Sequence, residues 1–267
     1  PLIFFFNRNP GLALPLIALQ YHEVRIDIDL ASTYANFDSL KVWGNYIYLD
    51  TEERRRFAQK GHEYLIEQVQ HTGSDSLASS AGATKQIRLS YNHPVKELVW
   101  CTTESSNVIG DANGVWNFTD TSVTVSSKLA SVEDSNVAIA PGAAGAPSLI
   151  GLAQFDEETS GPLDSFKLVL NGQDRFKEQG GKYFNSVQPF VHHSASPMPG
   201  VYAYSFALKP EEHQPTGTCN FSRIDNAQVS ISVKGASSPR ASASDKNTLN
   251  MFATNYNVLR IQSGMGG

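Results

Sequence analysis

The clearest pattern in the chain is an alternation of apolar and charged residues over residues 21–30 (YHEVRIDIDL). Val24, Ile26 and Ile28 lie at every second position, with charged residues between them. Successive side chains of a strand point to opposite faces of a sheet, so this period of two predicts a β-strand with one apolar face. Less regular patterns predict further strands at residues 46–49, 86–91, 95–102, 165–170, 201–208 and 227–233, with a last one inside 249–261. Residues 62–70 have a composition that also suits a helix, but they follow Gly61 and we interpret them as a strand.

One short helix interrupts this series of strands. Asp50 is a good N-cap and Glu53 stands three residues later, which is the spacing of a capping box. Gly61 suits a left-handed helix end, so we expect the helix to lie within residues 50–60. The long stretch 103–162 is rich in Ser, Ala, Gly, Asn and Asp and contains one weak strand candidate, residues 122–127. Short strands, long polar connections and no repeated βα unit predict an all-β antiparallel sandwich of the jelly-roll type.

Composition agrees with a folded protein of low charge. The chain has 267 residues, 18% charged and 10% aromatic, and a net charge of −5. Such a chain is too aromatic for a disordered polymer and too acidic to act mainly by gripping phosphate backbones. No stretch approaches the roughly 20 apolar residues of a membrane helix. The two cysteines, Cys101 and Cys219, are read as reduced thiols, because they offer neither a disulfide framework nor zinc-ligand spacing.

No catalytic, cofactor-binding or metal-binding motif emerges. The chain has no His-x-His or His-x-Asp pair, and the adjacent His192 and His193 would point to opposite faces of a strand. It also lacks a nucleophile elbow and a phosphate-binding loop. Two Asn-x-Ser/Thr triplets begin at Asn117 and Asn220, and Asn117, in the long polar stretch, is the better candidate for glycosylation. We therefore predict a non-enzymatic protein without cofactor, used for binding or assembly.

Several blocks of sequence together resemble the major capsid proteins of large eukaryotic double-stranded DNA viruses of the phycodnavirus and iridovirus type. The blocks are residues 7–24 (NRNPGLALPLIALQYHEV), 46–59 (YIYLDTEERRRFAQ), 62–68 (HEYLIEQ), 92–100 (NHPVKELVW), 200–226 (GVYAYSFALKPEEHQPTGTCNFSRIDN), 255–261 (NYNVLRI) and 263–267 (SGMGG).

This resemblance implies a double jelly roll, of which the chain would hold the end of the first roll and most of the second. Residues 1–43 would be the last strands of the first roll and a linker, and residues 44–267 the second roll. Because the partner strands of residues 1–43 would be absent, we expect this segment not to fold alone. The opening without Met also suggests a piece of a longer polypeptide.

The resemblance also implies a structural role. The protein would form homotrimers, pseudo-hexagonal capsomers that tile an icosahedral shell in the virion after assembly in the host cytoplasm. Its partners would be neighbouring capsomers and minor capsid proteins, near an internal viral membrane without inserting in it and without direct contact to nucleic acid. A carbohydrate-binding jelly-roll module is the main alternative, and a metal-dependent jelly-roll enzyme is a third.

Overall fold

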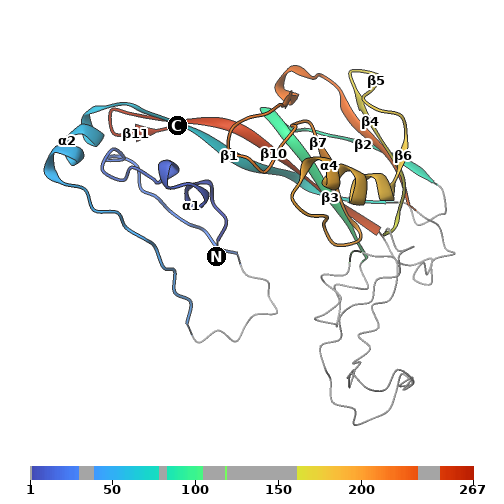
Figure 1. Ribbon diagram of the computed structural model, residues 1–267, viewed down its shortest axis with the longest axis horizontal. Coiled ribbons are helices and arrows are strands. Elements are labelled where there is room, and N and C mark those ends of the chain that lie inside the picture. Colours follow the sequence, from blue (N-terminus) through green and yellow to red (C-terminus); the bar gives the residue numbers. More distant parts are fainter. Residues whose placement is uncertain (1, 30–38, 78–82, 105–117, 119–160, 234–246) are drawn as a thin grey trace, which may run out of the picture. The chain divides into compact units, whose positions relative to one another are not determined.

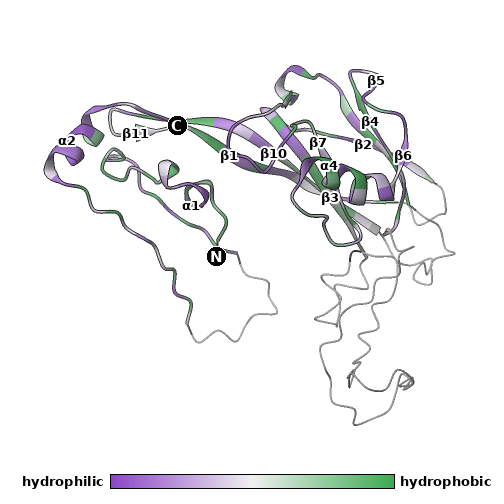
Figure 2. Cartoon of the chain, viewed as in Figure 1, coloured by the Kyte–Doolittle hydropathy of each residue, from purple (hydrophilic) through white to green (hydrophobic). Residues whose placement is uncertain are grey.

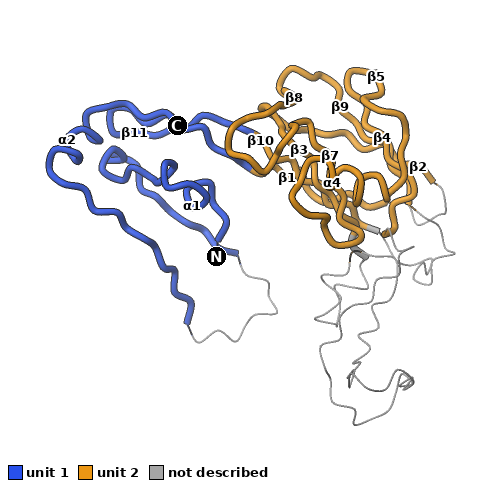
Figure 3. Tube along the Cα trace, viewed as in Figure 1, with its two compact units in different colours: residues 1–68, 256–267 blue, residues 69–255 orange. Residues whose placement is uncertain are grey.

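The structure is a computed structural model that describes residues 2–29, 39–77, 83–104, 118, 161–233 and 247–267 (Figure 1). It divides into two compact units (Figure 3). Unit 1 comprises residues 1–68 and 256–267, and unit 2 comprises residues 69–255. The boundaries between the units fall within two long strands, β1 (His62–Ser76) and β10 (Asn247–Gln262).

Two antiparallel sheets account for most of the regular structure. The first has the order β1-β10-β3-β7, with β3 at Pro94–Glu104 and β7 at Val201–Ser205, and it also pairs β8 (Cys219–Asn220) with β3 and β11 (Met265–Gly266) with β10. The second has the order β2-β9-β4-β5, with β2 at Thr84–Arg88, β9 at Ala227–Val233, β4 at Leu163–Leu170 and β5 at Gln173–Asp174, and β6 (Gln179–Gly180) pairs with β4. The prediction of an all-β antiparallel sandwich is confirmed.

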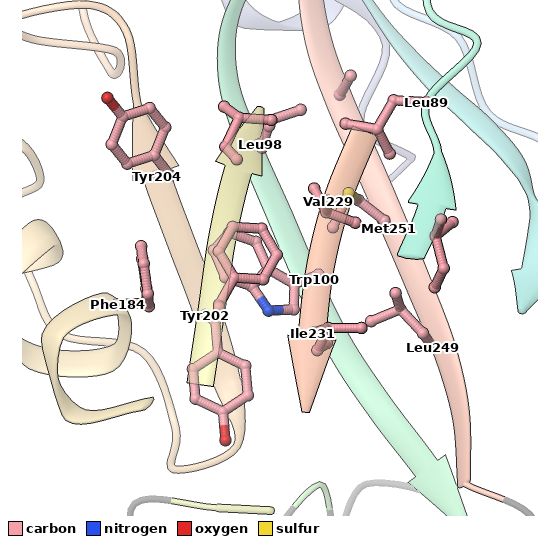
Figure 4. Close-up of a cluster of buried hydrophobic side chains, with 14 of the residues drawn as sticks. Leu89, Leu98, Trp100, Phe184, Tyr202, Tyr204, Val229, Ile231, Leu249 and Met251 are labelled. Carbon is pink, nitrogen blue, oxygen red and sulfur yellow. The ribbon is translucent and has the colours of Figure 1, made fainter. Parts of the chain in front are cut away.

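The core of unit 2 is an aromatic cluster centred on Trp100 of β3 (Figure 4). The Trp100 ring stacks on Phe166 of β4 at a centroid distance of 4.2 Å and lies 5.9 Å from Tyr202 of β7. Trp100, Phe166 and Tyr202 are fully buried. Since β3 and β7 belong to one sheet and β4 to the other, these rings join the two layers. Aliphatic side chains from β9 and β10, such as Val229 and Leu249, complete the packing.

Most predicted strands are present, with shifted ends. The strand expected at residues 62–70 continues to Ser76, and the one expected at 201–208 ends at Ser205. The early end has a local cause, because the Ser205 hydroxyl donates to the carbonyl of Ala207 (2.7 Å) and accepts from its N–H (3.2 Å). The N–H groups of Phe206 and Ala207 both donate to the carbonyl of Lys96 on β3, so the regular one-to-one ladder stops at this point.

Two predicted strands are absent. Residues 22–29 and 46–49 have no regular secondary structure. A period of two shows which side chains would share a face, but a strand also needs a neighbour to hydrogen-bond, and among the described residues no strand pairs with either segment. Val24, Ile26 and Ile28 are each at least 40% exposed. The weak candidate at 122–127 lies outside the described residues.

The predicted helix is α2 (Thr51–Gln59), and its capping box is present. The Asp50 carboxylate accepts from the Glu53 N–H at 2.9 Å, and the Glu53 carboxylate accepts from the Asp50 N–H at 3.4 Å. The expected left-handed end at Gly61 is wrong, because the helix ends at Lys60 with an extended backbone (φ −88°). Unit 1 also contains α1 (Phe5–Arg8) and the 3-10 helix η1 (Pro10–Leu12).

A second helical segment, between β6 and β7, was not predicted. It consists of the π-helical turn η2 (Tyr183–Val187) followed directly by α4 (Gln188–His192), and a 3-10 turn, η3 (Phe221–Arg223), follows β8. Pro189 argues against a helix when it is read inside the segment, but it occupies the first turn of α4, where its missing N–H costs little. We call the continuous segment Tyr183–His192 the η2–α4 helix.

Candidate assembly surface

The titratable and thiol side chains of the described residues were the first candidates for a functional site. No group of three or more His, Cys, Asp or Glu side chains is placed to hold a metal among them. Both thiols are free, and burial raises the pKa of Cys101 and of Cys219, which disfavours the reactive thiolate. In the part of the chain that the structure covers, no helix is long and apolar enough to cross a membrane.

The two adjacent histidines have different partners and do not form one site. His192 places its Nδ1 3.0 Å from the carbonyl oxygen of Leu208, and His193 places its Nε2 3.0 Å from a carboxylate oxygen of Glu97 on β3. The expected separation of the two side chains assumed that both residues lie on a strand, which is wrong because His192 is the last residue of α4. They are separated instead because α4 ends at His192 and the backbone becomes extended at His193.

The two glycosylation triplets also differ in what the structure says of them. Asn117 lies outside the described residues. Asn220 is partly buried, and its side-chain oxygen accepts from the N–H of Ser222 at 3.1 Å, while the Ser222 hydroxyl accepts from the N–H of His93 at 2.8 Å. Both polar residues of the second triplet therefore serve the turn at η3.

The feature that stands out on unit 2 is the η2–α4 helix, which is apolar on two faces. Its inner face is buried and includes Phe184 and Pro189. Its outer face carries Val187, Phe190 and Val191, which are 48%, 85% and 62% exposed. Residues at i, i+3 and i+4 lie on one side of a helix, so these three side chains form a stripe. Hydrophobic green recurs along α4 in Figure 2.

Polar contacts fix this helix to the sandwich from its buried side. The Asn185 amide donates to the carbonyls of Met198 (3.0 Å) and Val201 (2.8 Å), just before and at the start of β7. The Gln188 side chain donates to the Tyr183 hydroxyl (2.9 Å) and accepts from the Ser205 N–H (3.3 Å). The outer stripe is therefore held on a rigid support.

The connection after β7 lies against the C-terminal end of the same helix. His192 contacts the backbone of Leu208, whose side chain is 71% exposed. The Ser194 N–H and hydroxyl both donate to the Glu211 carboxylate at 3.1 Å. These hydrogen bonds lower the pKa of Glu211. We call Val187, Phe190, Val191 and Leu208 together the α4 patch.

Unit 1 carries a second exposed apolar segment at residues 40–48. It contains Trp43 and Tyr48, which are 89% and 93% exposed, and Tyr46, which is 71% exposed. The chain is irregular there, so these side chains are not part of a folded face of unit 1. Large exposed apolar groups of this kind are typical of surfaces that other protein elements cover.

Comparison with known protein families identifies the family to which the chain belongs. The family model described as "Large eukaryotic DNA virus major capsid protein" matches residues 53–267. The chain belongs to this family of capsid proteins. A second model, "Major capsid protein N-terminus", matches residues 1–50. The resemblance identified from the sequence blocks is confirmed.

Curated relatives in this capsid family match over the whole chain. The chain is 44% identical to the major capsid protein of Paramecium bursaria Chlorella virus 1, covering 65% of that protein, and 40% identical to that of Pyramimonas orientalis virus, covering 59% of it. It is 25% identical to the major capsid protein of Costelytra zealandica iridescent virus. The chain thus spans just under two thirds of the length of these relatives.

Solved structures agree with the family assignment. The chain matches a protein in a quasi-atomic model of the PBCV-1 virus capsid with a TM-score of 0.73 and 40% identity, over 100% of this chain and 68% of that one. It also matches PBCV-1 VP54, in a crystal structure fitted into a cryo-EM reconstruction of the virophage Sputnik, with a TM-score of 0.71 and 39% identity over 100% of this chain and 68% of that one. The jelly-roll prediction is confirmed by these matches.

Proposed function

We propose that this protein is a structural subunit of an icosahedral virus shell that self-assembles into trimeric, pseudo-hexagonal capsomers. The observation that carries the proposal is the match of the entire chain to a protein of the PBCV-1 virus capsid. The physical properties of the chain support it. Two packed sheets give a rigid wall, and a low density of charge reduces repulsion between many identical copies.

The mass and shape of the full-length protein in solution test this function. We expect a particle of three subunits by light scattering and a six-sided outline by negative-stain electron microscopy. A full-length protein that stays monomeric at every concentration would contradict the proposal. A monomer that binds a glycan array would point instead to the carbohydrate-binding alternative.

The proposed partners follow from the same role. Each trimer would contact neighbouring trimers and minor capsid proteins in the virion, close to an internal membrane but not within it, after assembly in the host cytoplasm. Direct contact with nucleic acid is not part of the proposal, because the net charge is −5. Cross-linking of purified virions followed by mass spectrometry would identify these neighbours. Cross-links to lipid-embedded peptides only, and none to other capsid subunits, would contradict this placement.

The role proposed is structural and not enzymatic. Its support is the capsid identity of the relatives together with the two cysteine thiols, whose raised pKa values suit packing better than nucleophilic attack.

We further propose that residues 1–43 close a first jelly roll and that residues 44–267 form the second. The two family models, which meet between residues 50 and 53, support a division close to this position. Limited proteolysis of the full-length protein should then cut first within residues 39–48, where the backbone is irregular and large side chains are exposed. First cuts inside β3 or β9 would contradict this division.

Asn117 is the proposed glycosylation site. When the protein is produced in a glycosylating host, Asn117→Gln should remove one glycan mass from the intact protein. Asn220→Gln is the matched control and should leave the mass of the glycans unchanged, because the Asn220 side chain is engaged in the turn at η3. Loss of glycan in the control alone would reverse the assignment.

A further inference from the structure

The η2–α4 helix departs from the usual pattern of a surface helix. Such helices bury one apolar stripe and present polar residues to water, whereas a helix that is apolar all round is normally buried on all sides. Here the buried Phe184 and the 85% exposed Phe190 lie on the same ten-residue segment. Folding of unit 2 accounts for the inner face only and leaves the three apolar side chains of the outer face exposed to solvent.

We infer that the α4 patch is a contact between subunits within the trimer and that its partner is a second copy of this chain. This inference rests on the proposed function. In a closed ring of three subunits each copy supplies one such patch to its neighbour, so three identical patches are covered at once.

The size of the patch suits the centre of an interface. Its four side chains expose on the order of 400 Å² of apolar surface, taking roughly 100 Å² for each. A stable interface buries about 800 Å² on each partner, with an apolar centre and a polar rim. The patch therefore provides about half of the area of one side, and the polar rim would supply the rest. Phe190 would be the anchor, because aromatic side chains dominate such centres.

The charges around the patch favour a protein partner over an anionic lipid or a nucleic acid. Lys209 pairs with Glu212 at 2.9 Å, and Glu211 accepts two hydrogen bonds from Ser194. Of these three charged residues the one cation, Lys209, is paired with a carboxylate, and the other two are acidic, which does not suit a phosphate surface. A rim of paired charges around an apolar centre is suited to another protein surface of low charge, and only 18% of the residues of this chain are charged.

The number of copies in which a shell protein is made also favours a second copy of this chain as the partner of the α4 patch. A shell protein is made in many copies, and an uncovered apolar patch on each copy would promote aggregation. A patch that is covered when the trimer closes is removed from solvent on every copy, whereas a scarce partner would leave most copies exposed.

The test uses the full-length protein with Phe190→Asp and Val191→Asp, followed by mass photometry over a dilution series. Val69→Asp is the matched control, because Val69 is 66% exposed, close to the 62% of Val191, and lies on β1 away from the helix in the sequence. Circular dichroism and thermal unfolding verify that each variant is folded.

We expect the wild type and Val69→Asp to form trimers with dissociation constants within about twofold of each other. Each of the three subunit contacts loses its anchor in Phe190→Asp, so the dissociation constant of each contact should rise by at least about thirtyfold, and in Val191→Asp by about tenfold. Trimers of both patch variants as stable as the wild type would overturn the inference and leave the proposed function intact. A wild type that never forms trimers would overturn both.

A membrane contact would give a third result. Flotation with phosphatidylcholine vesicles would then recover the wild-type protein but not Phe190→Asp, while both form equally stable trimers. That outcome would overturn the inference by assigning the patch to lipid.

Discussion

Replacing Phe184 by alanine should lower the free energy of unfolding far more than replacing Phe190, because only Phe184 lies on the buried face of the η2–α4 helix. The ring is fully buried, and its centroid lies 5.1 Å from that of Phe166 and 5.2 Å from that of Trp100. Buried Phe→Ala substitutions cost about 3–5 kcal/mol, and each lost aromatic pair adds to the simple loss of burial. The substitution leaves a cavity, and the rigid rings around it limit how far it can collapse. We therefore expect the free energy of unfolding of unit 2 to fall by about 4 kcal/mol. Phe190→Ala, on the exposed face of the same helix, should change the stability of the monomer by less than about 0.5 kcal/mol.

Hydrogen exchange of β9 measures this difference within unit 2 itself. A loss of about 4 kcal/mol corresponds to roughly a thousandfold faster exchange of the most protected amides. Both variants are compared as monomers, at dilutions where no trimer is present, because association stabilises the folded state. If exchange in Phe184→Ala were within tenfold of that in Phe190→Ala, the aromatic cluster would not hold the two sheets together and the reasoning would be refuted.

Three further predictions concern a turn, a buried hydroxyl and a helix cap. Gly161→Ala should lower the melting temperature of unit 2 clearly more than Gly172→Ala. Both glycines have φ near +80°, but of the two only Gly161 has neighbouring atoms with which the added methyl group would clash. Equal melting temperatures of the two variants would contradict this. Burial raises the pKa of Tyr91 to about 12, and its hydroxyl donates to the Met251 carbonyl at 2.9 Å. The neutral form is thus favoured in the folded state, so its stabilisation is complete below pH 10 and is lost as the pH rises towards 12. Absorbance titration of wild type against Tyr91→Phe should show one tyrosine that ionises late, and its absence from the wild type would refute the assignment. Asp50→Ala should weaken α2 by about 1 kcal/mol, seen as faster amide exchange within the helix, whereas unchanged exchange would show that the capping box is not needed.

Local sequence patterns predicted the parts of the fold that depend on local physics. The capping box at Asp50 and Glu53 involves neighbours three residues apart, and it is present as predicted. The strands β3 and β9 were recognisable because they are rich in β-branched and aromatic residues, and β4 was recognisable as a short, largely apolar run. The pairing of β3 with β10 joins residues about 150 positions apart, as between Met251 and Trp100, and nothing in either segment alone specifies that partner.

The wrong or missing predictions of secondary structure have a common physical cause. A sequence pattern describes one segment and not the segments that surround it in the fold. Residues 22–29 have an ideal strand pattern but no described partner strand, so they remain irregular. Pro189 disfavours a helix in general, yet at the first turn of α4 it is well tolerated. The spacing of Val187, Phe190 and Val191 could have revealed the helix, because it is a helical spacing and not a strand spacing. It could not have shown that this face is the exposed one, since that depends on Phe184 reaching the core.

Phe184 and Phe190 together show how folding and assembly can be encoded in one short helix. The first contributes to the core of its own unit, and the second is almost fully exposed on a rigid support. A substitution at Phe184 should therefore lower the free energy of unfolding and reduce assembly only indirectly, through the loss of folded protein. A substitution at Phe190 should leave unfolding of the monomer unchanged and weaken the trimer directly. Measuring both quantities on both variants distinguishes a contact surface from a helix that is merely incompletely packed: in the second case Phe190→Asp would alter neither quantity, and the exposed stripe would have no role in assembly.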